Sequence, residues 1–222
     1  MLGMHRSGTS CLTGSLQQAG ICLGDCHTWN PYNRKGNREN QRIVDLNDRV
    51  LAENGGAWNH PPVTVNWSAS ALMSARDLLA DHADSAVFGF KDPRTLLVLD
   101  GWKTVCPHLQ FIGVFRHPLA VADSLARRDG MSTQDALALW YQYNRRLYQQ
   151  WQRGSFPVLC FDEPQAEFNA KLADVLREAG MGSPENCGSF YDPDLRSAQA
   201  SGTGGLPWRI RLLLRKLHRI AR

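Results

Sequence analysis

The chain has 222 residues, of which 43% are hydrophobic and 21% are charged, so it can bury one sizeable core and is neither disordered nor collagen-like. No run approaches the roughly 20 apolar residues that a membrane-spanning helix needs. The formal net charge is +4, but residues 207–222 hold several basic side chains and no acid, which leaves the rest of the chain slightly acidic. A protein built to coat nucleic acid is therefore not expected, and the positive charge is a local feature of the C-terminus.

Apolar runs of strand length alternate with segments of helical periodicity. The strand candidates are residues 1–4, 86–90, 111–115 and 158–161. The helix candidates are residues 9–19, 41–53, 68–83, 119–128, a long helix that begins with the capping-box spacing at 132–135, and residues 166–179 and 207–222. Strands joined by helices within one sheet pair in parallel, so we expect an α/β fold with its ligand site at the carboxyl ends of the strands.

The apolar run at residues 1–4 is typical of the last part of a buried strand, so we expect that strand to begin upstream of Met1. Neither a basic n-region nor an apolar h-region of a signal peptide is visible. This pattern favours a cytoplasmic location, and any upstream targeting segment would lie outside this sequence.

The cysteines are scattered without a Cys-x-x-Cys pair, which favours reduced thiols. Cys22, Cys26 and His27 are close enough to suggest part of a zinc site. A fourth ligand at zinc spacing is missing, so we expect no metal site.

A phosphate-binding loop is predicted at residues 3–10, between the first strand and the first helix. The segment matches the frame G-x-x-x-x-G-K-[ST], except that Thr9 occupies the lysine position. Its glycines and backbone N–H groups favour a bound phosphate, and Arg6 supplies a cation. The missing lysine, and the absence of an apolar strand ending in an aspartate, argue against a nucleotide held through Mg²⁺. The alternative is a glycine turn with a helix cap formed by Ser7 or Thr9.

A second anion site is predicted where the strand at 111–115 ends in Arg116 and a helix begins at Pro118. Ser124 follows about two helical turns later, within reach of the same phosphate. Two anion sites at one sheet edge indicate a nucleotide with phosphates at two places.

These residues carry a resemblance to a known family. The run HRSGTS at residues 5–10 resembles the 5′-phosphosulfate loop of the sulfotransferase family, and Arg116 with Ser124 resembles its 3′-phosphate motif. Residues 91–94 resemble the Lys-Asp-Pro motif of tyrosylprotein sulfotransferases, and residues 31–39 are similar to an Asn-Pro-x-Gly-x-x-Glu segment of bacterial members. The donor implied is 3′-phosphoadenosine 5′-phosphosulfate (PAPS), which would leave as adenosine 3′,5′-bisphosphate. The donor-binding positions implied are Arg6, Ser7, Gly8, Thr9, Ser10, Arg116 and Ser124.

The resemblance also implies a three-layer P-loop nucleotide-binding fold, in which helices flank a central parallel sheet. We expect it to occupy residues 1–200. Residues 201–222 would form a linker and a basic amphipathic helix.

Sulfuryl transfer needs a base for the acceptor proton and positive charge at the leaving phosphate. Lys91 and Arg6 are the expected cations. Many cytosolic sulfotransferases use a histidine two residues after a comparable lysine, but that position is Pro93 here. The resemblance favours Glu39 as the base, so the catalytic residues expected are Glu39, Lys91 and Arg6. The other candidates for the base are Asp92 and His117.

The roles of three residues near the expected site need separate comment. Glu39 is also suited to interact with the dipole of the helix at 41–53. Arg94 is suited to orient the loop, to contact the acceptor or to pair with an acid, and the sequence does not separate these roles. His5 is expected to pack within the loop.

An acceptor pocket is expected between the phosphate loop and Lys91, where several aromatic residues lie among Asn, Pro and Gly: Trp29, Tyr32, Trp58 and Trp67. Exposed rings there would stack on a sugar, whereas buried rings would cover the core. The resemblance favours a hydroxyl or amine of a carbohydrate or glycoconjugate, with small alcohols, peptides and lipids as alternatives.

The C-terminal helix groups apolar residues on one side and basic residues on the other, with Trp208 and Leu212 as exceptions. We expect it to dock on the body, with contact to an anionic membrane surface as the alternative. The late nucleotide motif of the family has only weak counterparts in Arg196 and residues 201–205.

Two other functions are compatible with part of the pattern. A P-loop kinase would need the lysine and the metal-holding acid that are absent. A non-catalytic nucleotide-binding or membrane-tethered module would bind PAPS or its product without turnover.

Overall fold

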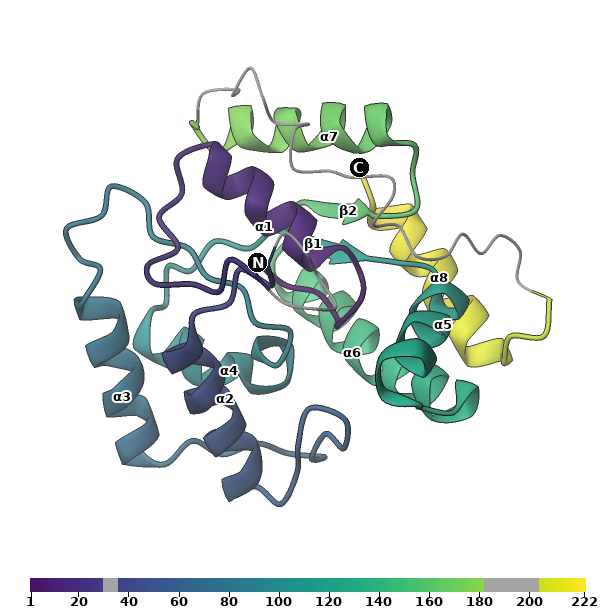
Figure 1. The fold of residues 1–222 in the computed structure, drawn as a ribbon, viewed down its shortest axis with the longest axis horizontal. Helices are drawn as coiled ribbons and strands as arrows, with labels where there is room; N and C mark the ends of the chain where they lie inside the picture. Colours follow the sequence, from purple (N-terminus) through teal and green to yellow (C-terminus); the bar gives the residue numbers. More distant parts are fainter. Residues whose placement is uncertain (30–35, 182–203) are drawn as a thin grey trace.

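A computed structural model describes residues 1–29, 36–181 and 204–222 (Figure 1). The order of elements is α1 (Thr9–Gln18), α2 (Gln41–Glu53), α3 (Ala69–Ala80), α4 (Thr95–Val105), β1 (Gly113–Phe115), α5 (Pro118–Asp129), α6 (Thr133–Arg153), β2 (Val158–Cys160), α7 (Gln165–Glu178) and α8 (Trp208–Ile220). The predicted α/β class and the predicted helices are confirmed.

β1 and β2 form a parallel pair, with Gly113 opposite Val158. Leu2 joins the other side of β1 through one bridge, and Cys22 pairs in the same way with Phe88. The predicted strands at residues 1–4 and 86–90 are therefore extended segments held at single bridges. The central sheet of several strands that was expected is not present among the described residues, where the ladder has only β1 and β2.

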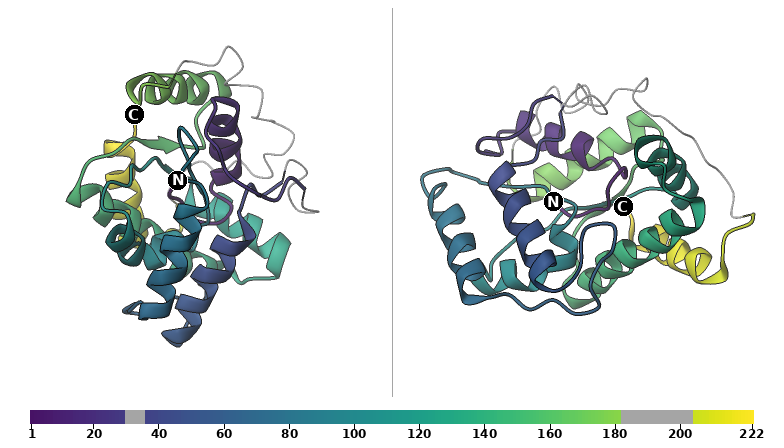
Figure 2. Two further views of the ribbon diagram at one scale, coloured as in Figure 1. Left: turned by 90° about the vertical axis from the view of Figure 1, so that its left-hand side faces the viewer. Right: turned by 60° about the horizontal axis from the view of Figure 1, so that its bottom comes forward.

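Hydrophobic side chains pack on both faces of this short sheet, because successive residues of a strand point to opposite sides. On one face Val114 and Leu159 pack with side chains of α1 and α7, including Leu16 and Phe168. On the other face Phe115 joins a larger cluster built from α2, α3, α4, α5, α6 and α8. Figure 2 shows α1 and α7 on one side of the strands and the remaining helices on the other.

Caps set the start of two helices that carry the site. The Asn40 side chain accepts hydrogen bonds from the backbone N–H groups of Arg42 and Ile43 and so caps α2. Ser132 accepts from the N–H of Asp135 at 3.1 Å, which confirms the capping-box spacing at the start of α6.

Helix α4 was not predicted from the sequence. Residues 95–99 are all buried and mostly apolar, and the exposed polar residues Asp100 and Thr104 come only later, so the first half of the segment shows no helical periodicity. The helix also contains a kink at Val98. At Gly101 an added Cβ would lie 2.1 Å from the ring of Trp67, which packs against Trp102 and donates to the carbonyl of Val98. The close approach of this ring therefore requires glycine within the helix.

Candidate active site

The loop that leads into α1 has the backbone of an anion-binding nest. Arg6 and Gly8 take left-handed conformations, with φ of 63° and 83°. A Cβ on Gly8 would lie 2.2 Å from the ring of Phe161, so space as well as φ requires glycine. No side chain of the described residues caps α1, so the alternative of a cap by Ser7 or Thr9 is wrong. The first N–H groups of α1 are thus left for a ligand anion.

The side chain of Ser7 is fully buried in this loop. Its hydroxyl has no hydrogen-bond partner within residues 1–29, 36–181 and 204–222. A buried hydroxyl without a partner costs about 1–3 kcal/mol. An anionic oxygen bound in the loop would remove that cost.

The two predicted anion sites meet in the structure. Arg6 Nε donates to Ser124 Oγ at 2.7 Å, and Arg116 Nη1 donates to the carbonyl oxygen of Arg6 at 3.3 Å. Ser124, expected to share a phosphate with Arg116, therefore contacts the arginine of the loop. Burial lowers the pKa of Arg6 to about 10, and the nearby charges of Arg128 and Arg116 add to the shift. The crowding of cations favours binding of an anion between them.

Asp162, which follows β2, engages the Arg116 segment. Its carboxylate accepts from the backbone N–H of His117 and lies 3.5 Å from Arg116 Nε. The Nδ1 atom of His117 accepts from the N–H of Leu119, so His117 caps α5. This role at the helix start disfavours His117 as the base.

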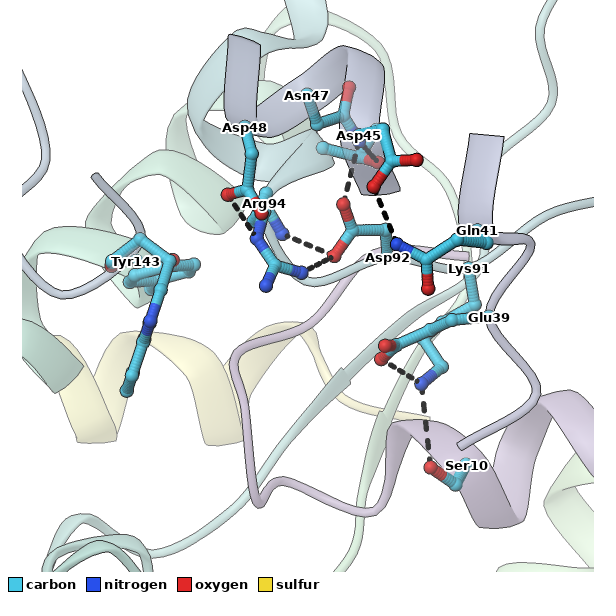
Figure 3. A network of polar contacts seen from close by, with 12 residues as sticks. Ser10, Glu39, Gln41, Asp45, Asn47, Asp48, Lys91, Asp92, Arg94 and Tyr143 are labelled. Atoms are coloured by element: carbon cyan, nitrogen blue, oxygen red, sulfur yellow. Dashed lines mark hydrogen bonds and ion pairs between the residues drawn. The ribbon is translucent and has the colours of Figure 1, made fainter. Parts of the chain in front are cut away.

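Glu39 and Lys91 form an ion pair beside the loop (Figure 3). Lys91 Nζ lies 2.7 Å from Glu39 Oε1 and 3.4 Å from Ser10 Oγ. Ser10 in turn donates to the carbonyl of Asn37 at 3.2 Å. The side chain of Lys91 is 2% exposed and that of Glu39 is 13% exposed. Asn40, and not Glu39, caps the start of α2. The carboxylate of Glu39 pairs with Lys91 instead.

Asp92 and Arg94 belong to a second network, in which Asp92 is buried (Figure 3). Asp92 Oδ1 accepts from Nη1 of Arg94 at 2.8 Å, and Asp92 Oδ2 accepts from Nδ2 of Asn47 at 2.8 Å. Arg94 Nε lies 2.6 Å from Asp48 Oδ1, and Asn47 Oδ1 accepts from the indole of Trp102. Burial raises the pKa of Asp92, whereas Arg94 and Asn47 favour its charged form. Both oxygens of Asp92 are engaged, so it holds the start of α4 and is disfavoured as the base.

His5 lies at the centre of these groups. Its ring is 4.6 Å from that of Trp58 and 5.9 Å from that of Tyr143, as its predicted packing role requires. Burial lowers the pKa of His5 well below 6.5, so the ring is neutral at pH 7. The cations that lower the pKa further are Arg94, Arg128, Lys91 and Arg6. The loop, the segment after residue 90 and the end of α5 therefore converge on one point.

A comparison of the sequence with protein-family models agrees with this geometry. A model described as the sulfotransferase family matches residues 1–181, which is most of the chain. The chain belongs to the sulfotransferase family. No curated protein and no solved structure matches this sulfotransferase.

The aromatic residues expected at the acceptor side of the sulfotransferase differ in their surroundings. Trp58 is half-buried, its carbonyl accepts from the Tyr143 hydroxyl, and its ring lies under Arg128 at 5.1 Å. Trp67 is also half-buried, and its ring packs against Trp102 and the core cluster, which is the alternative role expected for these rings. Trp29 is 68% exposed.

Some predicted residues lie outside the described part of the chain. These are Tyr32 and the rest of residues 31–35, together with Arg196 and residues 201–203. The structure does describe the end of the segment that is similar to bacterial sulfotransferases, namely Asn37, Arg38 and Glu39.

Sequence reasoning missed the polar residues of α2 that hold Asp92 and Arg94. Asn47 is fully buried on a helix whose other buried residues are mostly apolar. A buried amide on an apolar face is a signal that the sequence carries, since such a group needs hydrogen-bond partners. Among the described residues, no three His, Cys, Asp or Glu side chains gather as a metal site would require, and no helix is long and apolar enough to cross a membrane.

Proposed function

We propose that this sulfotransferase moves a sulfuryl group from PAPS to a hydroxyl or amine of an acceptor. The observation that carries the proposal is the Glu39–Lys91 ion pair beside Ser10, at the edge of the phosphate loop. It brings a carboxylate that can take a proton and a cation that can stabilise a leaving phosphate to one point.

The residues fit a nucleotide with phosphates at two places. The open start of α1 and the unpartnered hydroxyl of Ser7 suit the 5′ end, where Gly8, Thr9 and Ser10 continue the loop. Arg116, which is 4% exposed, and Ser124, which is 2% exposed, would hold the 3′-phosphate near Arg6. The donor therefore meets fixed, buried groups at both ends.

The chemistry assigned to the site balances as follows. A bond forms between sulfur and the acceptor oxygen or nitrogen while the bond from sulfur to the phosphate oxygen breaks. The acceptor proton goes to the Glu39 carboxylate, and the electron pair of the broken bond stays on the phosphate. Lys91 and Arg6 would offset the charge that develops there. Adenosine 3′,5′-bisphosphate and the sulfated acceptor are released.

A kinase-like reaction receives less support from the same site. Thr9 stands where a kinase loop has lysine, and Arg116 is the residue that follows β1. Asp162 follows β2, but its carboxylate is engaged with His117 and Arg116. We further propose a carbohydrate or glycoconjugate as the acceptor, supported by the half-buried ring of Trp58 next to His5.

Calorimetric titration tests the donor class. Adenosine 3′,5′-bisphosphate in EDTA, and ATP with Mg²⁺, are titrated into the wild type, Arg116→Ala and Arg76→Ala. Arg76 is an exposed arginine on α3 and serves as the matched control. We expect metal-independent binding of the bisphosphate that falls at least about tenfold only in Arg116→Ala, since charge-assisted hydrogen bonds contribute about 1.5–3 kcal/mol each.

Thermal unfolding of the three proteins shows whether Arg116→Ala is folded. If it is not, Ser124→Ala replaces it in the titration. Binding of ATP with Mg²⁺ but not of the bisphosphate would overturn the proposal. The absence of binding of either ligand would also overturn it.

A further inference from the structure

Helix α8 exposes a line of residues that the fold does not use. Trp208, Leu212, Arg215 and Arg219 are spaced at four, three and four positions, so they follow one side of the helix. We name these residues the outer stripe. Trp208 is 62% exposed and Leu212 is 46% exposed. Large apolar side chains thus lie on the solvent side of an otherwise basic face.

The packing of α8 does not need the outer stripe. The buried side chains of the helix are Ile210, Leu213, Leu214 and Leu217, and the helix lies against α6 at the edge of the molecule (Figure 1). The predicted docking of this helix on the body is therefore confirmed. Trp208 and Leu212, which break the amphipathic division in the sequence, are directed away from the body.

The charge around the outer stripe has one sign. The exposed arginines of α8 are Arg209, Arg211, Arg215 and Arg219, and the helix contains no acid. Within the described ranges none of them forms an ion pair with a carboxylate. Arg209 instead lies over the ring of Trp208 at 5.4 Å. The nearest ion pair along the chain, between Arg222 and Glu178, lies beyond the helix end.

We propose that the outer stripe of α8 binds the surface of a membrane that contains anionic phospholipids. The arginines would pair with lipid phosphates, while Trp208 and Leu212 would enter the boundary between headgroups and acyl chains. A nucleic acid or an acidic glycan would also attract the arginines. Neither needs an outward leucine next to an outward tryptophan, so the apolar pair favours lipid.

The docked state of α8 makes this surface ready to bind. The helix is already folded on the body, so binding does not require the backbone of α8 to become ordered first. His218 of α8 packs against Phe115, the residue before Arg116, with ring centroids 5.2 Å apart. A membrane bound at the outer stripe would thus be linked, through α8 and its contact with Phe115, to β1, the strand that leads into the site. This inference does not depend on the proposed sulfuryl transfer.

Sedimentation with vesicles tests the proposal. The full chain is mixed with vesicles of phosphatidylcholine alone and with vesicles of equal parts phosphatidylcholine and phosphatidylglycerol. We expect binding only to the anionic vesicles, weakened by added salt. Replacing Arg211, Arg215 and Arg219 by Gln should lower partitioning about 100-fold, since each basic residue contributes about fivefold. Trp208→Ala with Leu212→Ala should lower it at least about tenfold.

The matched control removes three exposed arginines elsewhere. The triple variant Arg42→Gln, Arg49→Gln, Arg76→Gln on α2 and α3 loses the same charge and should bind vesicles like the wild type. Thermal unfolding checks that each variant is folded. Little change is expected, because all the replaced residues are exposed and the ion pairs of Arg42 with Asp81 and of Arg49 with Glu53 lie at the surface.

Three outcomes would overturn the proposal. The first is equal sedimentation with both kinds of vesicle. The second is an equal loss of binding in the control triple variant, which would indicate a general charge effect. The third is tight binding of a single-stranded DNA oligonucleotide without binding to anionic vesicles, which would assign the face to another anion.

Discussion

Replacing Glu39 with glutamine tests the base assigned to the site. The change keeps the size of the side chain and an oxygen that can accept from Lys91 Nζ, now 2.7 Å from Glu39 Oε1. It removes the charge and the ability to take the acceptor proton. Loss of a positioned general base lowers the rate about 10²–10⁴-fold. We therefore expect kcat to fall at least about 100-fold.

The structure separates this loss from an effect on donor binding. Lys91 is 2% exposed and pairs with Glu39, so the variant leaves a buried ammonium with a neutral partner. That change should cost about 1–3 kcal/mol of stability, because the hydrogen bond remains while its charge assistance is lost. The positive charge facing the donor is not reduced. The affinity for adenosine 3′,5′-bisphosphate should thus stay within about threefold of the wild type, a difference below 1 kcal/mol.

The assay measures release of the bisphosphate from PAPS at saturating acceptor, alongside calorimetry and thermal unfolding. Glu53→Gln is the control, since Glu53 lies exposed at the end of α2, the helix that follows Glu39. It should leave kcat unchanged. A Glu39→Gln protein with lowered stability and a kcat near that of the wild type would refute the assignment. Glu39 would then act only as the counterion of Lys91.

Two further predictions concern the phosphate loop. Gly8→Ala should destabilise the protein by about 1–2 kcal/mol more than Gly55→Ala in urea unfolding. Both glycines have positive φ, but only Gly8 has a ring within 4 Å of an added Cβ. Equal losses of stability in the two variants would contradict the close contact. His5→Gln should reduce the loss of stability on acidification. Burial holds the pKa of His5 well below 6.5, so below about pH 6.5 the unfolded chain takes a proton that the folded protein does not, and stability falls. Melting temperatures of both proteins at several pH values between 7.5 and 5 check this, and parallel curves would rule out a buried neutral His5.

Much of the secondary structure could be predicted because its signals are local. The cap at Ser132 and the apolar faces of α2 and α6 depend on neighbours within a few turns. Helix α4 could not be predicted in this way. It is buried on most sides, and its Gly101 is explained only by Trp67, which approaches from a distant loop. The sheet was overestimated because apolar runs do not reveal how many residues will pair.

The amino-acid sequence by itself determined the chemical types at the site: a glycine-containing loop without a kinase lysine, an arginine after a strand, and candidate acids and bases near strand ends. Only the tertiary structure decided which of these meet. Lys91 contacts Glu39 across 52 positions of sequence, and Arg6 contacts Ser124 across 118. Such pairs depend on how the strands and helices pack, which no short window of sequence contains. For the same reason, packing on α6 decided that Trp208 and Leu212 of α8 stay exposed while most of the other large apolar residues of the helix are buried.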